Sequence, residues 1–226
     1  MFYFPVQTKG ALRHISQVIV VGLCGGAGAV VFRTFIEIVQ GFFFDFILPQ
    51  ISQEVYGYNI SLIFLPAIGG LLVGLIIWRV AIETRGYGIP EVMESMHVHA
   101  RRIRKRVAFT KIITSAITVG SGGSAGREGP IAQIGASFGS LIGQIVNLSE
   151  RQRKVLIASG LAAGVGATFN APLGAAIFAI EILFVEFEAI SATAIILASV
   201  IGTAFASIFL GPHHAFRVSD GLTFSF

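Results

Sequence analysis

An acidic residue that could do chemistry lies in apolar surroundings at Gly126-Arg127-Glu128-Gly129-Pro130. The runs on either side are uncharged and apolar enough for a lipid bilayer. Placing an ionisable group at the centre of a membrane helix costs at least about 2.5–3.5 kcal/mol, so such a group is by default a functional candidate. Arg127 and a helix start favour the anionic form of Glu128, whereas burial opposes it. We therefore take Glu128 as the first candidate functional residue.

Glu128 belongs to one of three points at which a flexible or glycine-rich turn leads into proline: Gly86–Glu91, Gly126–Pro130 and Gly166–Pro172. Proline is favoured in the first turn of a helix, so each point predicts a helix start. Helix N-termini offer free N–H groups and about half a positive charge, which attract anions. The second and third starts are expected to lie within the membrane. Several helix starts that converge there predict an anion pathway, and ordinary proline kinks in long helices are the alternative.

The composition indicates an integral membrane protein whose helices position these starts. Hydrophobic residues make up 54% of the chain and charged residues 12%, and the mean hydropathy is +0.80. A helix needs roughly 17–25 residues to cross the hydrocarbon core. Uncharged runs of about this length or longer recur at Ile15–Phe32, Ile60–Trp78, Gly129–Ser149, Val155–Ile180 and Ala189–Phe216. The short alternating segments of a membrane β-barrel are absent, so we predict an all-α, multi-pass fold, in the cell membrane if the source is prokaryotic.

The third proline point interrupts the run Val155–Ile180, so a helix is expected to begin inside the membrane there. Broken helices at that depth are tolerated only where they are buried in protein or line a cavity. Other glycines recur at the spacing with which membrane helices pack closely. These small-residue stripes are Gly135, Gly139 and Gly143, the pair Gly70 and Gly74, and the pair Gly160 and Gly164.

The net charge of +4 is concentrated in a basic loop at residues 101–106. Basic residues in short loops mark the cytoplasmic face, so we expect this loop to be cytoplasmic and expect no nucleic-acid binding. The single cysteine, Cys24, lies in an apolar run and is interpreted as a buried thiol. No metal site, cofactor or catalytic residue is predicted.

These motifs are similar to those of the CLC chloride channels and chloride/proton antiporters. The sequence GREGP at Gly126–Pro130 resembles the central motif of that family, and Gly86–Glu91 resembles its GSGIPE motif, with Tyr87 in the serine position. The stretch Phe169–Glu181 resembles the segment that leads to the intracellular glutamate, and Lys111 matches a basic residue that precedes GREGP. The resemblance extends from the first helix to the loop after Leu210.

The resemblance implies residue roles. Glu128 is the expected gate, which competes with the anion and opens the path when protonated or displaced. The implied anion pathway and gate comprise Gly126, Arg127, Glu128, Gly129, Tyr87, Gly88, Ile89, Pro90 and Lys111. Tyr87 replaces a small hydroxyl that normally reaches the anion, so its phenol either donates its O–H or leaves only backbone amides. Chloride is therefore expected because the family carries it, and it is not deduced from the residues of the site.

The position implied for internal proton transfer is Ile182, where the acid is absent, and its neighbour Glu181 matches the first of two adjacent acids in some antiporters. This substitution favours a channel modestly. Glu186 and Glu188 are interpreted as a solvated helix end, with proton entry as the alternative.

The family fold has two inverted halves and roughly twice this length, so residues 1–226 are expected to be its first half, and the chain a fragment. The intact protein is expected to be a homodimer in lipid that carries chloride or a related anion and, in the antiporters, protons. Two alternatives remain: a structural membrane half-domain, and an intramembrane hydrolase with Ser124 in Gly122–Gly126 as its nucleophile.

Overall fold

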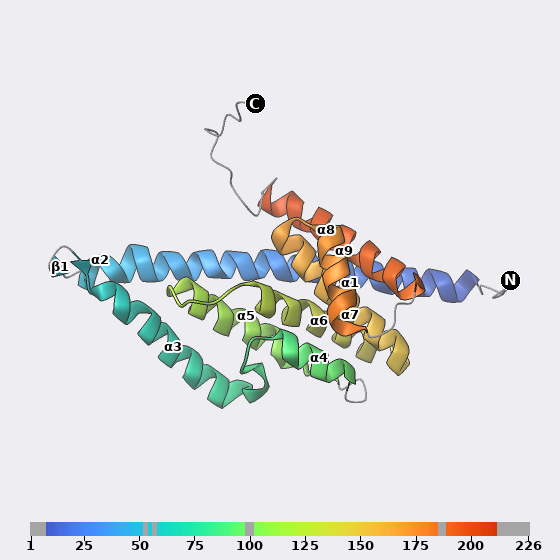
Figure 1. Cartoon of the computed structure of the whole chain (residues 1–226), viewed down its shortest axis with the longest axis horizontal. Coiled ribbons are helices and arrows are strands. Elements are labelled where there is room, and N and C mark those ends of the chain that lie inside the picture. The colour runs from blue at the N-terminus through green and yellow to red at the C-terminus, as the bar shows by residue number, and fades with distance from the viewer. Residues whose placement is uncertain (1–7, 52–53, 56–57, 98–101, 185–188, 212–226) are drawn as a thin grey trace, which may run out of the picture.

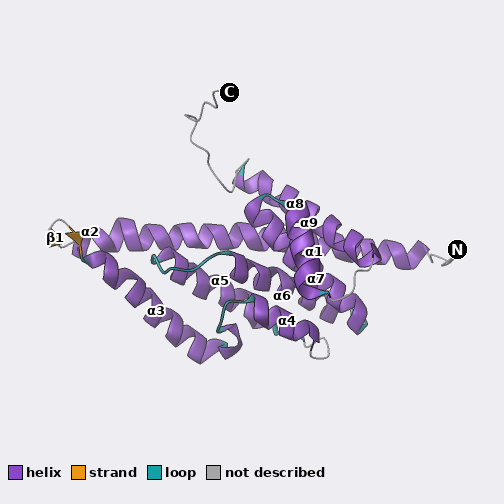
Figure 2. Ribbon diagram, in the orientation of Figure 1, coloured by secondary structure: helices purple, strands orange, loops and turns teal. Residues whose placement is uncertain are grey.

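The computed structural model describes residues 8–51, 54–55, 58–97, 102–184 and 189–211. Nearly all of this part is helical (Figure 2), which confirms the predicted all-α class. The long helices are α1 (Thr8–Gly41), α3 (Ser61–Val80), α5 (Lys105–Gly120), α6 (Glu128–Ile145), α7 (Glu150–Phe169) and α9 (Ala189–Leu210). The shorter elements are the π-helix η1 (Phe42–Ile47), α2 (Leu48–Ile51), the 3-10 helix η2 (Ile82–Thr84), α4 (Ile89–His97), α8 (Pro172–Leu183) and an antiparallel pair of strands, β1 (Glu54–Val55) and β2 (Tyr58–Asn59).

Three helical segments in the described ranges are long and apolar enough to cross a bilayer: Arg13–Ile51, Ser61–Val80 and Ser191–Leu210. The second agrees with the predicted run Ile60–Trp78, and the third with the start of Ala189–Phe216, whose last residues lie outside the described part. The predicted first helix, Ile15–Phe32, proves much longer, because its apolar pattern continues past Arg33 and the chain stays helical through η1.

The predicted run Val155–Ile180 is two helices, as the third proline point indicated. Helix α7 ends at Phe169, Asn170 adopts a left-handed conformation with φ 54°, and α8 begins with Pro172. Our prediction placed flexibility at Gly166, but this glycine lies inside α7. Helix α8 has only 12 residues, and at about 1.5 Å per residue it covers only part of a 30 Å hydrocarbon core.

Helices α6 and α7 pack backbone to backbone through the predicted glycine stripes. A β-carbon built on Gly135 would overlap the carbonyl oxygen of Gly160, and one on Gly139 would overlap that of Leu156. A β-carbon on Gly164 would lie 3.0 Å from the carbonyl oxygen of Ile131. The partners run in opposite sequence order, so α6 and α7 are antiparallel. The turn from α7 into α8 consequently lies at the same end of the pair as Glu128.

The other predicted stripe, Gly70 and Gly74, does not pack within the described chain, because no atom lies within 4 Å of a β-carbon built on either residue. On α3, only Ser61, Leu65 and Gly69 are buried, and Gly69 contacts Ser121. The contact that the spacing predicted is therefore missing, because α3 turns this face away from the other described helices.

Helix α1 forms a long rod that organises the rest (Figure 1). Helices α7, α8 and α9 cross one end of this rod, and α4, α5 and α6 lie along one side of it. The contact with α9 is close, because a β-carbon on Gly26 would lie 2.5 Å from the carbonyl oxygen of Gly202. The main core is centred on small and branched residues of α6, α7 and α8 and is completed by residues of α1, α4, α5 and α9. This core fixes the start of α6, where the candidate site lies.

Candidate anion site

Glu128 is the first residue of α6 and follows a loop. Arg127 is the residue that precedes the helix, and its carbonyl accepts the first helical hydrogen bond, from the N–H of Ile131 at 3.1 Å. Gly126 and Arg127 are exposed, Glu128 is half-buried, and Gly129 and Pro130 are buried. The first N–H groups of a helix have no acceptor within it, and the partial positive charge of the helix is concentrated there.

The carboxylate of Glu128 folds back over the backbone of Gly126. A β-carbon built on Gly126 would overlap Oε2 of Glu128, so only glycine leaves room for this side-chain position. The carboxylate thus lies at the N-terminal end of its own helix.

The loop before α4 is the second part of the site. Gly86 and Gly88 have φ angles of +106° and +114°, in the left-handed region that favours glycine. Tyr87, between them, is 50% exposed. Helix α4 begins at Ile89 with Pro90 in its first turn, as the sequence predicted.

The two loops meet at a glycine–glycine contact. A β-carbon on Gly88 would lie 2.5 Å from the carbonyl oxygen of Gly129. A β-carbon on Gly129 would overlap the carbonyl oxygen of Tyr87 and lie 3.0 Å from its ring carbons Cδ1 and Cε1. The aromatic ring of Tyr87 therefore covers the start of α6. The structure thus brings the consecutive residues Tyr87 and Gly88 against Gly129, which lies far from them in the sequence.

Lys111 lies on α5 and is only 3% exposed. Its ammonium group donates hydrogen bonds to the carbonyl oxygens of Thr84 at 3.1 Å and Gly86 at 2.7 Å. Lys111 thus holds the loop before α4 by its backbone. The resemblance placed Lys111 in the anion pathway, and the geometry gives it a supporting contact with that pathway's loop.

Glu91, the last residue of the motif Gly86–Glu91, fixes the loop before α4, a contact that our sequence analysis did not predict. Its Oε2 accepts a hydrogen bond from the backbone N–H of Gly88 at 2.7 Å. Glu91 is the third residue of α4, the position from which an acid reaches back to the residue before a helix. That spacing was the signal that could have identified it. The N–H of Gly88 already donates to Glu91, so it is not available to an anion. The role of Gly88 is therefore its positive φ angle, which shapes the loop.

The third helix start, at Pro172, lies at the same end of the α6–α7 pair as Glu128. The carbonyl of Pro172 accepts a hydrogen bond at 2.8 Å from Oγ of Ser199 on α9, and the same hydroxyl also contacts the carbonyl of Ala162 at 3.0 Å. These bonds tie the break between α7 and α8 to α9. In the described part of the chain, no hydrogen bond joins Pro172 to Glu128.

The remaining predicted residues lie outside this contact. Ile182 packs against the main core and Glu181 is exposed on α8, whereas Glu186 and Glu188 lie outside the described residues. Ser124 is exposed in the loop before α6. In the basic loop, Ile103 is held against α6, because its carbonyl accepts a hydrogen bond from Nε2 of Gln144 at 3.0 Å.

Comparison with known proteins identifies the family of the chain. A family model described as voltage-gated chloride channel matches residues 69–226. An uncharacterized protein of Methanocaldococcus jannaschii is 30% identical over 94% of this chain and 48% of its own length. The H(+)/Cl(-) exchange transporter ClcA of Klebsiella pneumoniae is 32% identical over 80% of this chain and 39% of its own length.

Among solved structures, a slow cyanobacterial Cl-/H+ antiporter has a similar fold, with a TM-score of 0.74 and 24% identity. The match covers 92% of this chain and 49% of that one. The chain thus spans about half or less of the length of these relatives. The relatives named by function are transporters, which supports the expectation that this chain is not an enzyme. Because the family model covers more than half of the sequence, the chain belongs to the voltage-gated chloride channel (CLC) family.

Proposed function

We propose that residues 1–226 form the first half of a CLC-type anion pathway in which Glu128 is the gate. The observation that carries this proposal is the contact between the loop at Tyr87–Gly88 and the start of α6 at Gly129. It places two helix N-termini together, and each offers backbone N–H groups and partial positive charge to one anion. The carboxylate of Glu128 stands at the same helix end, so it competes with the anion for these groups.

Chloride is the proposed anion, because the transporter from Klebsiella pneumoniae is named for chloride and proton exchange. Tyr87 is the residue that bears on selectivity. Its ring covers Gly129, so its phenol and the backbone amides around Ile89 define the proposed site. Arg127 is exposed beside the gate and adds positive charge there. The intact protein is proposed to be a homodimer in lipid.

Glu128→Gln tests the gate. The change keeps the size of the side chain and removes its charge and its proton exchange, so chloride flux should lose its dependence on pH and any coupled proton movement should stop. Both fluxes are measured together in liposomes that contain the full-length protein. Coupled proton flux in the unchanged protein would identify an antiporter, and its absence a channel.

The matched control is Glu37→Gln. Glu37 is an exposed acid on α1 that pairs with Arg33 at 2.9 Å, away from the proposed site. This variant should keep the pH dependence of the unchanged protein. A Glu128→Gln variant whose chloride flux retained the original pH dependence would refute the gating role.

A further inference from the structure

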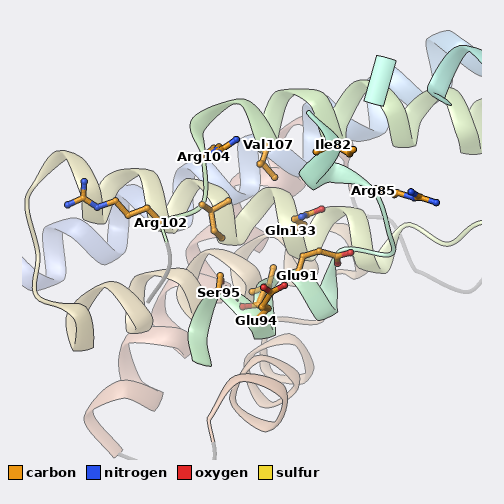
Figure 3. A pocket seen from close by; sticks show the side chains of 11 residues that line it. Ile82, Arg85, Glu91, Glu94, Ser95, Arg102, Arg104, Val107 and Gln133 are labelled. Carbon is orange, nitrogen blue, oxygen red and sulfur yellow. Dashed lines mark hydrogen bonds between the residues drawn. The ribbon is translucent and has the colours of Figure 1, made fainter. Parts of the chain in front are cut away.

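A cavity of about 420 Å³ lies beside the proposed anion site, between α4, α6 and the segment before α5. Figure 3 shows Glu91 of α4 and Gln133 of α6 among the side chains that line it. Both residues approach Gly88, the residue before α4, Glu91 through its carboxylate and Gln133 through its Cβ. The cavity therefore reaches the loop of the proposed anion site.

The carboxylate of Glu91 is held by the loop before α4. Its Oε2 accepts a hydrogen bond from the N–H of Gly88 at 2.7 Å, and a β-carbon built on Gly86 would overlap its Oε1. A carboxylate that accepts from a backbone N–H at a helix start occupies the position of a bound anion. In this conformation, the ionised Glu91 therefore keeps an anion from the N–H of Gly88.

Gln133 offers the carboxyl group of Glu91 a second partner. Gln133 is 3% exposed, and its Oε1 has no hydrogen-bond partner among the described residues. Its Cβ lies 3.2 Å from a β-carbon built on Gly88, the same residue whose N–H binds Glu91. A buried acceptor without a donor is costly. An ionised carboxylate cannot supply that donor, whereas a protonated carboxyl group can.

The charge that acts on Glu91 comes from Lys111 of α5, whose ammonium attracts the carboxylate. The guanidinium groups of Arg85 and Arg102 point away from the cavity in Figure 3. Among the described side chains, the other charged groups on the surrounding elements are Glu94 on α4, Arg104 before α5, Lys105 and Arg106 at the start of α5, Glu128 on α6 and Glu181 on α8. Lys111 thus opposes the departure of the carboxylate, and neutralisation of Glu91 removes this attraction.

We propose that Glu91 is a second carboxylate gate, which exchanges its hydrogen-bond partner when it takes up a proton. The ionised carboxylate accepts from the N–H of Gly88. The neutral acid donates its O–H to Oε1 of Gln133 and leaves the N–H of Gly88 to an anion. The proton enters from solvent through the cavity and returns there when the anion leaves. Hydrogen bonds to ionised groups are roughly twice as strong as neutral ones, so neutralisation also weakens the bond to Gly88.

The exchange makes proton binding and chloride binding favour each other, because such coupling is reciprocal. A lower pH should therefore raise the affinity of the loop for chloride. This role rests on the proposed anion pathway, whereas the exchange between Gly88 and Gln133 can be observed without chloride. At saturating chloride, a change in affinity does not alter flux, so the flux test on Glu128 and the tests on Glu91 are independent.

Infrared spectroscopy of the full-length protein in chloride-free detergent solution tests the exchange itself. Acidification should produce a carboxylic acid C=O band that is missing in Glu91→Gln. The same band should shift in Gln133→Met, where the acceptor of the O–H is lost. Thermal unfolding checks that both variants are folded. A band that Gln133→Met leaves unchanged would overturn the exchange, as would the absence of any band that depends on Glu91.

Chloride binding by the full-length protein, measured by calorimetry at neutral pH, tests the role as a gate. Glu91→Gln should bind chloride about tenfold more tightly than the unchanged protein, because the competing charge is gone and a backbone N–H is released to the anion. A residue that only caps the helix would give the opposite result, because its loss loosens the loop. Unchanged or weaker chloride binding by Glu91→Gln would therefore overturn the proposal.

The matched control is Glu94→Gln, at an exposed acid one turn later on α4 that lines the same cavity. This variant should keep the chloride affinity of the unchanged protein, and a tenfold gain in it as well would overturn the specific role of Glu91. Absence of chloride binding by all three proteins would refute the anion pathway and with it the gate, whereas the exchange seen by infrared spectroscopy would stand.

Discussion

The buried charge of Lys111 supports the loop of the proposed anion site through its backbone. Two of its three N–H donors bind the carbonyls of Thr84 and Gly86, which belong to the loop before α4. Thr84 is itself fixed, because its hydroxyl donates to the carbonyl of Ala81 at 2.7 Å. The left-handed conformation of Gly86 is thus held from outside the loop. Lys111 is a positioning residue in this arrangement.

Replacing Lys111 with methionine should loosen this loop. The change leaves the carbonyl of the buried Thr84 without its donor, at a cost of about 1–3 kcal/mol. It also frees the carbonyl of the exposed Gly86, and part of the cost is offset because a buried ammonium is removed. We expect a lower thermal unfolding temperature and weaker chloride binding, measured by calorimetry in detergent.

The control for Lys111→Met is Lys105→Met, which removes a lysine that is exposed at the start of the same helix. It should leave both unfolding and chloride binding unchanged. Equal effects of the two variants would exclude the positioning role of Lys111.

For single residues, the sequence identified the candidate site residues better than the residues that they contact. Glu128 stood out because an acid in apolar sequence is costly, and it does lie at a helix start. The partners of Lys111 lie 25 and 27 residues earlier in the chain, and no local pattern specifies such a distance. The cap from Glu91 to Gly88 was local, and the spacing of three residues could have revealed it.

Helix starts and glycine contacts organise the elements. All three proline points begin a helix, α4, α6 or α8, because proline restricts φ to a helical value and lacks the N–H that a first turn cannot satisfy. The end of α7 was harder to predict, because Asn170 rather than a glycine adopts the left-handed conformation there. Asparagine tolerates this region better than most residues, so the position was only weakly marked.

The glycine stripe of α6 packs against α7, whereas the stripe of α3 meets no other described residue. This difference predicts how alanine substitutions in the two stripes affect stability. Gly139→Ala would put a methyl group into the carbonyl oxygen of Leu156, so we expect a destabilisation of about 1–3 kcal/mol from overpacking between α6 and α7. Thermal unfolding in detergent measures this effect.

Gly74→Ala is the matched change on α3, where no described atom lies within 4 Å. It should be neutral or stabilise the helix by about 0.5–1 kcal/mol, because alanine loses less backbone entropy than glycine in a helix. A large loss of stability in this variant of the full-length protein would show that another surface packs on α3.

The spacing of small residues therefore predicted which glycines could pack but not which ones do. Gly135 and Gly139 face a neighbouring helix, whereas Gly70 and Gly74 have the same spacing and face none in the described chain. The difference arises from the tertiary arrangement, since α3 meets α5 only along the face that carries Gly69. Periodicity indicates a face of a helix, and its partner is set by the whole fold.

At the scale of the whole molecule, the chain covers about half of a CLC-type antiporter, 49% of the cyanobacterial one. The proposed anion site has one wall here, made by α4 and α6. We propose that the opposite wall would come from a second inverted half, as the resemblance implies. A pathway needs both walls to exclude lipid and to replace the water around the anion.

We therefore predict that residues 1–226 expressed alone insert into membranes but carry no chloride. Flux from liposomes containing this chain should equal that from empty liposomes, whereas liposomes containing the full-length protein should release chloride. Release above background by the isolated chain would show that it completes a pathway by itself, for example by pairing with a second copy.

The length of the first helical segment makes the protein sensitive to the membrane around it. Arg13–Ile51 is 39 residues of continuous helix, which is about 58 Å at roughly 1.5 Å per residue and far exceeds a hydrocarbon core of about 30 Å. Such a segment must tilt or extend beyond the core, and its tilt depends on the thickness of the bilayer. Because α1 contacts α5, α6, α7 and α9, lipids with longer or shorter acyl chains would alter the angle at which the whole bundle sits in the membrane.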